Sequence, residues 1–132
     1  MDNLFKLNIK NYISENEKNF DIELSYELFG QPVGQAPIVL VNHALTGNSS
    51  VIGKNGWWNS LIGQNKLIDT NDFTVLAFNF PGNGYDGFFI KNYEDLILRD
   101  IANIFLIFLE KLKIKKLFAI IGGSIGGGLV WE

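Results

Sequence analysis

Two stretches near the start of the chain alternate apolar and polar residues. Apolar and polar residues alternate over residues 4–13 and again over residues 20–29, and a polar segment, residues 14–19, joins them. The apolar positions of the second stretch are Phe20, Ile22, Leu24, Tyr26 and Leu28. A period of two is typical of strands with one buried face. We therefore predict a pair of half-buried antiparallel strands.

Further along, the apolar positions form continuous runs. Residues 38–41, 73–80 and 117–121 read as short strands buried on both faces, and a Gly/Pro turn region, residues 30–37, precedes the first. Residues 57–62 favour a short helix.

The longest helix is predicted over residues 92–112, which lack Gly and Pro and are apolar nearly all round. Asp95 lies near its start and Lys111 and Lys113 near its end, as the helix dipole favours. A last helix is predicted to follow from Ile125.

The order of these elements indicates the fold class. Two antiparallel strands followed by alternating strands and helices predict an α/β protein with a parallel sheet and right-handed crossovers. The run Gly122-Gly123-Ser124-Ile125-Gly126 contains G-x-S-x-G directly after an apolar strand. In a strand–turn–helix setting this motif forms a nucleophile elbow. The whole pattern is typical of the opening half of an α/β-hydrolase fold.

The elbow makes specific demands on its residues. Its turn is so tight that we expect Ser124 to hold a strained backbone conformation. Side chains at positions 122 and 126 would collide with the turn, so the two glycines there give it room. The alternative to a nucleophile elbow is a flexible Gly/Ser turn without a catalytic role, and the preceding strand argues against it.

Two phosphate-binding readings fit less well. Residues 82–87 match G-x-G-x-x-G after a strand, but no helix opens on these glycines, as a dinucleotide site requires. We interpret them as a loop at the carboxyl edge of the sheet. Residues 122–128 are no phosphate loop either, since Gly128 and Leu129 stand where Lys and Ser/Thr are needed.

His43 is the single histidine and a tempting general base for Ser124. It follows directly on the strand over residues 38–41, in the loop that supplies an oxyanion-hole N–H in α/β-hydrolases, whereas their catalytic histidine follows the serine in chain order. We therefore assign His43 to that loop.

Composition narrows the class further. The chain is 47% hydrophobic, has a net charge of −3 and contains no cysteine. These values predict a globular domain and exclude disulfides and thiolate metal sites. Without a basic stripe we expect no nucleic-acid or membrane partner. No signal sequence is visible at the N-terminus, and a cytoplasmic location is expected.

The position of the elbow predicts a larger protein. The chain ends at Glu132, inside the helix that should support Ser124. The strand over residues 117–121 would then have an open apolar edge, which natural proteins avoid. We expect residues 1–132 to be the N-terminal portion of a single α/β-hydrolase domain.

Four segments resemble the homoserine O-acetyltransferases of methionine biosynthesis. They are residues 42–47 (Asn-His-Ala-Leu-Thr-Gly), 56–58 (Gly-Trp-Trp), 79–84 (Asn-Phe-Pro-Gly-Asn-Gly) and 122–127 (Gly-Gly-Ser-Ile-Gly-Gly), and the final Leu-Val-Trp-Glu is similar too. The resemblance runs from about residue 38 to the last residue. The Asp and His of the family's triad, and its lid, lie beyond residue 132.

The resemblance implies transfer of an acyl group from acetyl-CoA, as co-substrate, to L-homoserine. Ser124 would be the nucleophile, and the backbone N–H groups of Leu45 and Ile125 would form the oxyanion hole. Neither a metal nor a resident cofactor is implied, and a homodimer of the full-length protein is left open. The motifs do not separate acetyl from succinyl donors or homoserine from serine acceptors. An esterase or other hydrolase and a non-catalytic protein of the same fold remain the alternatives.

Overall fold

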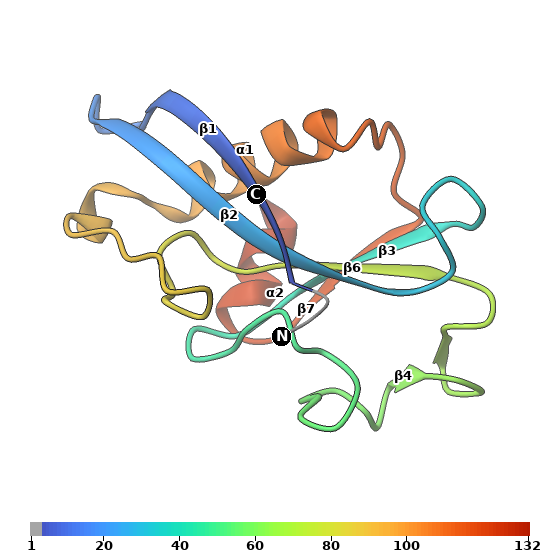
Figure 1. Cartoon of the computed structure of the whole chain (residues 1–132). Coiled ribbons are helices and arrows are strands. Elements are labelled where there is room, and N and C mark those ends of the chain that lie inside the picture. The colour runs from blue at the N-terminus through green and yellow to red at the C-terminus, as the bar shows by residue number, and fades with distance from the viewer. Residues whose placement is uncertain (1–3) are drawn as a thin grey trace.

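The computed structural model describes residues 4–132 and contains a five-stranded mixed sheet (Figure 1). The sheet contains β1 (Phe5–Ile13), β2 (Asn19–Gly30), β3 (Ile38–Asn42), β6 (Thr74–Phe78) and β7 (Ala119–Gly122). Two short strands, β4 (Ile62–Gly63) and β5 (Ile68–Asp69), lie outside it. The helices are the 3₁₀ turn η1 (Tyr93–Asp95), α1 (Leu98–Lys111) and α2 (Ile125–Trp131). Residues 1–3, where a signal sequence would begin, lie outside the described range.

The strand order in the large sheet is β1-β2-β6-β3-β7. The pairs β1–β2 and β2–β6 are antiparallel, while the pairs β6–β3 and β3–β7 are parallel. The antiparallel pair and the parallel sheet predicted from the sequence are therefore both confirmed. β4 and β5 form a separate two-stranded ribbon in the connection between β3 and β6, which the sequence did not predict.

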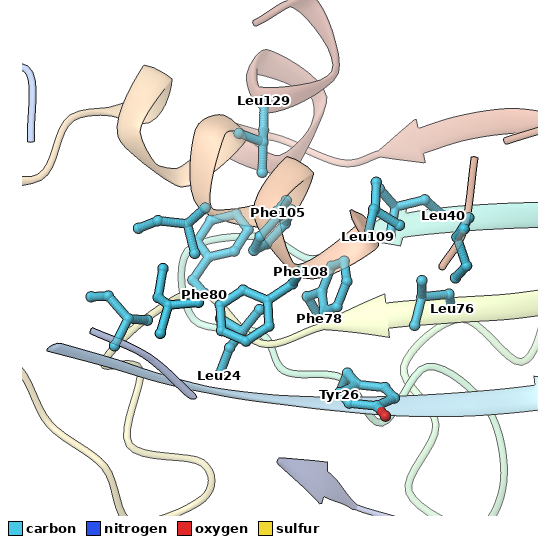
Figure 2. Close-up of a cluster of buried hydrophobic side chains, with 14 of the residues drawn as sticks. Leu24, Tyr26, Leu40, Leu76, Phe78, Phe80, Phe105, Phe108, Leu109 and Leu129 are labelled. Carbon is cyan, nitrogen blue, oxygen red and sulfur yellow. The ribbon is translucent and has the colours of Figure 1, made fainter. Parts of the chain in front are cut away.

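One face of the sheet packs against both α-helices. Phe105, Phe108 and Leu109 of α1 and Leu129 of α2 lie over the strands (Figure 2). The strand residues beneath them include Leu24, Tyr26, Leu40, Leu76 and Phe78. These helices and the alternating face of β2 thus make the main core.

The opposite face is covered by the long connection between β3 and β6. Val39, Val41 and Val75 pack there against Val51 and Ile62 of that connection. β3 and β6 are therefore buried on both faces, as their continuous apolar sequence predicted. The same cover also buries Ser25 and Glu27 of β2, although the period of two had assigned these polar positions to solvent.

Three expected elements differ from the prediction. No helix forms over residues 57–62; residues 57–61 form a series of turns and Ile62 begins β4. The Asn59 side chain donates to the carbonyls of Gly53 and Gly56. Such local side-chain bonds compete with a short helix, which has little cooperative stability of its own. The strand predicted over residues 117–121 is β7, and it lies at the sheet edge with Ile120 exposed, so it is not buried on both faces.

The long helix begins later than predicted. η1 occupies its expected start, Leu96 is extended, and α1 begins at Leu98. The acidic residue near the helix start is therefore Asp100 rather than Asp95, and its Oδ2 accepts the backbone N–H of Ile97 at 2.9 Å. Leu106 is exposed, so α1 buries one face and is not covered all round.

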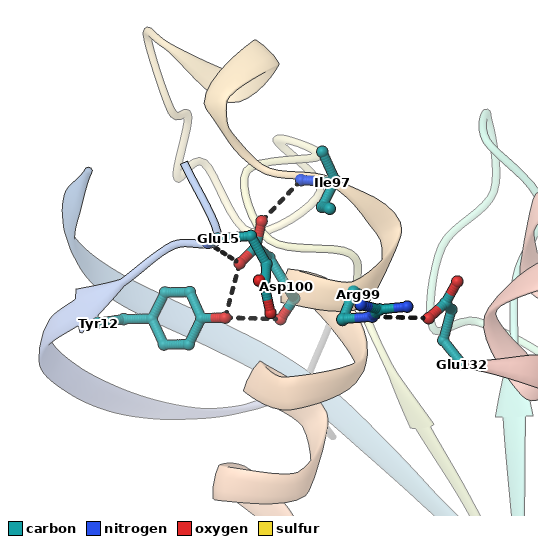
Figure 3. Close-up of polar contacts among 6 residues, drawn as sticks. All are labelled: Tyr12, Glu15, Ile97, Arg99, Asp100 and Glu132. Carbon is teal, nitrogen blue, oxygen red and sulfur yellow. Dashed lines mark hydrogen bonds and ion pairs between the residues drawn. The ribbon is translucent and has the colours of Figure 1, made fainter. Parts of the chain in front are cut away.

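Asp100 also fastens the first hairpin to α1 (Figure 3). Its Oδ1 accepts the Tyr12 hydroxyl at 2.8 Å and the Glu15 backbone N–H at 2.9 Å. Burial, and then the hydrogen bond to Asp100, raises the pKa of Tyr12 to about 12. A fully buried carboxylate with three donors thus joins β1, the hairpin turn and the start of the helix.

Candidate active site

Ser124 lies in the turn between β7 and α2, the setting predicted for an elbow. Its backbone has φ 56° and ψ −125°, a conformation that residues with side chains rarely adopt. The residue is exposed, and its Oγ makes no hydrogen bond to any residue between positions 4 and 132. A strained serine with a free hydroxyl is thus presented at the carboxyl edge of the sheet.

The two flanking glycines are required by close backbone contacts. A Cβ at Gly122 would lie 2.3 Å from the carbonyl oxygen of Gly126. At Gly126 it would lie 2.4 Å from the carbonyl oxygen of Asn42. The steric reason given for these glycines from the sequence is therefore confirmed, and the second contact packs the first turn of α2 onto the end of β3.

β3 brings the loop after it to the elbow. Asn42 pairs with Gly122 in the parallel ladder, so the loop that begins at His43 starts beside the turn that holds Ser124. The backbone N–H groups of Leu45 and Ile125 have no backbone or side-chain acceptor among the described residues 4–132. Free N–H groups on two adjoining turns are what an oxyanion hole uses.

His43 has both ring nitrogens engaged within the protein. Nε2 accepts the backbone N–H of Phe80 at 3.0 Å, so Nδ1 carries the proton and donates to the carbonyl of Ala44 at 2.6 Å. Burial lowers the pKa of His43 below its usual 6.5. A neutral imidazole held in this way is not free to take a proton from Ser124, in agreement with its assignment to the loop.

The glycines of residues 82–87 belong to an irregular loop after β6. Gly82, Gly84 and Gly87 all have positive φ, and no helix opens on them. The next helical turn, η1, begins only at Tyr93. The loop interpretation is therefore confirmed against the dinucleotide site.

A buried polar cluster beneath the loop after β3 was not predicted from the sequence. It consists of Ser25 and Glu27 on β2, Ser49 in the loop after β3, and Asn79 after β6. One signal could have revealed it. β2 pairs with β6, a strand buried on both faces, so polar side chains of β2 on the covered face are also shielded from solvent.

Two kinds of feature are absent from the described part of the chain, a metal-binding cluster and a membrane-spanning helix. No group of three or more His, Cys, Asp or Glu residues within residues 4–132 is placed to bind a metal ion. Among the same residues, no helix is both long and apolar enough to cross a membrane.

Comparisons with known proteins agree with this geometry. The alpha/beta hydrolase fold family model matches residues 37–132. A homoserine O-acetyltransferase from Methanocorpusculum labreanum is 34% identical, over 80% of this chain and 25% of its own length. The structure of a homoserine O-acetyltransferase from Staphylococcus aureus superposes with a TM-score of 0.80 at 30% identity, covering 96% of this chain and 40% of that one. Esterase E22 gives a TM-score of 0.78 at 25% identity, with 93% and 41% covered. The chain thus spans well under half the length of these relatives.

Proposed function

Because this chain belongs to the α/β-hydrolase fold family, we propose that it is the N-terminal portion of one such domain, residues 1–132, in a serine acyltransferase. The reaction proposed is that of a homoserine O-acetyltransferase, which places the protein in methionine biosynthesis and in the cytoplasm. The observation that carries the proposal is the strained Ser124 between β7 and α2, beside two free backbone N–H groups. The similarity to named homoserine O-acetyltransferases supports the substrate class.

In the first half-reaction, Ser124 Oγ attacks the thioester carbonyl of acetyl-CoA. The N–H groups of Leu45 and Ile125 bind the oxyanion that forms, and preorganised donors of this kind contribute a few kcal/mol each. The C–S bond then breaks, coenzyme A leaves as its thiol, and the acetyl group stays on Ser124.

In the second half-reaction, the hydroxyl of L-homoserine attacks the acyl-enzyme. The ester product leaves and Ser124 regains its proton. The base that moves these protons is proposed to be a histidine paired with an aspartate outside this chain, since both nitrogens of His43 are already bonded.

Transfer is tested by the release of coenzyme A from acetyl-CoA by the full-length protein. Parallel reactions contain water alone, L-homoserine or L-serine, and succinyl-CoA serves as a second donor. We expect release to be fastest with acetyl-CoA and L-homoserine, and to be lost in Ser124→Ala together with covalent acetylation. A preference for serine would keep the mechanism and change the substrate.

An esterase is the second candidate, favoured by the superposition with esterase E22. An esterase that acts on simple acyl esters needs no group that binds the charged ends of an amino acid. Equal coenzyme A release with and without either amino acid would therefore support the esterase, and no acetylation of Ser124 at all would support a non-catalytic protein.

A further inference from the structure

Glu27 is a buried carboxylate that the proposed reaction does not use. It lies on β2, on the face covered by the connection between β3 and β6, and its side chain accepts the hydroxyl of Ser49. The two ion pairs found within residues 4–132, Lys6–Glu23 and Arg99–Glu132, do not include it. Burying a carboxylate without a cation is unfavourable unless hydrogen bonds compensate for the lost hydration, so the bonds that Glu27 accepts are important for the fold around it.

Ser49 is held by Asn79 as well as by Glu27. The backbone N–H of Ser49 donates to Asn79 Oδ1 at 2.8 Å, and Asn79 Nδ2 donates back to Ser49 Oγ at 2.8 Å. Asn79 Nδ2 also donates to Ser25 Oγ at 2.8 Å. Ser49 and Asn79 are 0% and 2% exposed, so water does not compete for these bonds.

The charge of Glu27 fixes the direction of these bonds. An ionised carboxylate can only accept, so the Ser49 hydroxyl must donate to it. The hydroxyl oxygen is then left to accept from the Asn79 amide, whose own oxygen is left for the Ser49 N–H. A neutral glutamine could donate instead and would allow the hydroxyl to reverse.

Ser49 is one of two points at which the loop over residues 43–49 is tied to the end of β6. The other is His43, whose ring binds the Phe80 N–H. Leu45 lies between these ties and is 70% exposed. The Gly47 N–H and the His43 ring both donate to the carbonyl of Ala44 and close the turn within the loop, so the placement of this turn on the sheet depends on the two ties. The position of the Leu45 N–H relative to Ser124 is thus set by the ties at His43 and Ser49.

We propose that Glu27, acting through Ser49 and Asn79, is a positioning residue for the oxyanion hole. This inference rests on the proposed function, in which the Leu45 N–H binds the developing oxyanion. Glu27 itself touches no reacting atom. It orients the hydroxyl that anchors the loop, and the loop presents the donor.

The test compares Ser49→Ala and Glu27→Gln in the full-length protein with Asp100→Asn as a matched control. Asp100 is also a buried carboxylate with several donors, but it holds the first hairpin to α1. For each variant we would measure kcat and KM for acetyl-CoA, thermal unfolding, and the affinity for an alkyl boronic acid. The boronic acid bonds to Ser124 Oγ as a tetrahedral anion, so it reports on the oxyanion hole directly.

We expect Ser49→Ala to lower kcat by ~10- to 100-fold, because complete loss of one oxyanion donor costs about 10²–10³-fold and a displaced donor less. Boronate affinity should fall by the same factor, with KM within about twofold. Glu27→Gln should show a smaller loss of kcat and of boronate affinity. This second variant tests the inference even if Ser49→Ala does not fold. Asp100→Asn should lower only the unfolding temperature.

Two results would overturn the inference. If the Ser49 and Glu27 variants lose stability alone, as the Asp100 variant should, the cluster is structural and the proposed function is untouched. If the unmodified full-length protein takes neither acetyl nor boronate at Ser124, the proposed function fails, and the positioning role fails with it.

Discussion

At the scale of single residues, Ser124 holds a backbone conformation suited to glycine. A side chain at φ 56° and ψ −125° costs on the order of 1–3 kcal/mol. We predict that Ser124→Gly raises the free energy of unfolding by ~1 kcal/mol, after the extra entropy of an unfolded glycine is subtracted. Ser124→Ala, which keeps the Cβ, should give no such gain. Urea unfolding of the two variants would show this, and equal stabilities would mean that the turn is not strained.

Two glycines of α2 give a matched pair of substitutions. In Gly126→Ala the new methyl group would lie 2.4 Å from the carbonyl oxygen of Asn42, whereas in Gly128→Ala its nearest neighbour is Leu98 Cδ2 at 3.4 Å. We predict that Gly126→Ala destabilises the protein by ~2 kcal/mol or more, in the range of overpacked cores. Gly128→Ala should be neutral or stabilising by up to ~1 kcal/mol, through helix propensity. Thermal unfolding of both variants checks the difference.

His43 should make stability depend on pH. Burial lowers its folded-state pKa below 6.5, so the unfolded chain binds a proton more readily than the folded one. The free energy of unfolding should then fall as pH drops below about 6.5, by up to ~1.4 kcal/mol per pH unit. His43→Gln should remove this slope. Urea titrations between pH 7.5 and 5.5 would measure it, and an unchanged slope in the variant would assign the effect to other groups.

At the scale of elements, the strands followed from the sequence because their side chains repeat with a simple period. The alternation of β1 and β2 predicted the strands but only part of their burial, whereas β3 and β6 are apolar and buried throughout. The motif around Ser124 also predicted the elbow, because the close backbone contacts at Gly122 and Gly126 leave no room for a side chain.

Two features that the sequence did not predict, the start of α1 and the cluster around Glu27, have a different cause, which is long-range contact. The start of α1 depends on an Asp100 carboxylate that also binds Tyr12 and Glu15, far away in the sequence. The cluster around Glu27 depends on a loop that folds back over β2. Contacts between residues so far apart in the sequence cannot be predicted from local periodicity. The start of α1 and the cluster around Glu27 were therefore not predicted.

The joint between β1 and α1 can be tested through Tyr12. Its hydroxyl is one of three donors to the buried Asp100 side chain, at 2.8 Å. We predict that Tyr12→Phe lowers the free energy of unfolding by ~1–2 kcal/mol, because the carboxylate loses a donor that water cannot easily replace. In the Asp100→Asn background the same change should cost less, since the two residues interact. If the losses of stability in Tyr12→Phe and Asp100→Asn were purely additive in a double-mutant cycle, the two residues would not interact and the prediction would be wrong.

At the scale of the whole molecule, apolar surface gathers beside β7. Leu106, Ile120 and Trp131 line a hollow of about 280 Å³, and the outer edge of β7 has no strand partner among residues 4–132. An exposed apolar patch next to a free edge favours association. We predict that the 132-residue chain self-associates at micromolar concentration and that Ile120→Lys or Trp131→Lys reduces this.

Leu67→Lys is the matched control for these variants, because Leu67 is also exposed but lies between β4 and β5. Sedimentation velocity would compare the three variants with the unmodified chain. If Leu67→Lys reduced self-association as much as Ile120→Lys does, added charge alone, and not the β7 surface, would govern association.

The pairing of β3 also has a consequence for synthesis on the ribosome. Leu40 meets its first neighbour, Leu76, soon after it is made, but Val39 must wait for Ala119, about 80 residues later. At a translation speed of roughly 5–20 residues per second, one side of β3 stays open for ~4–16 s. The strand beside the elbow is thus the last to be enclosed in the nascent chain. Slow codons between β6 and β7 would prolong that interval, so the soluble yield of this protein depends on the pace of its translation.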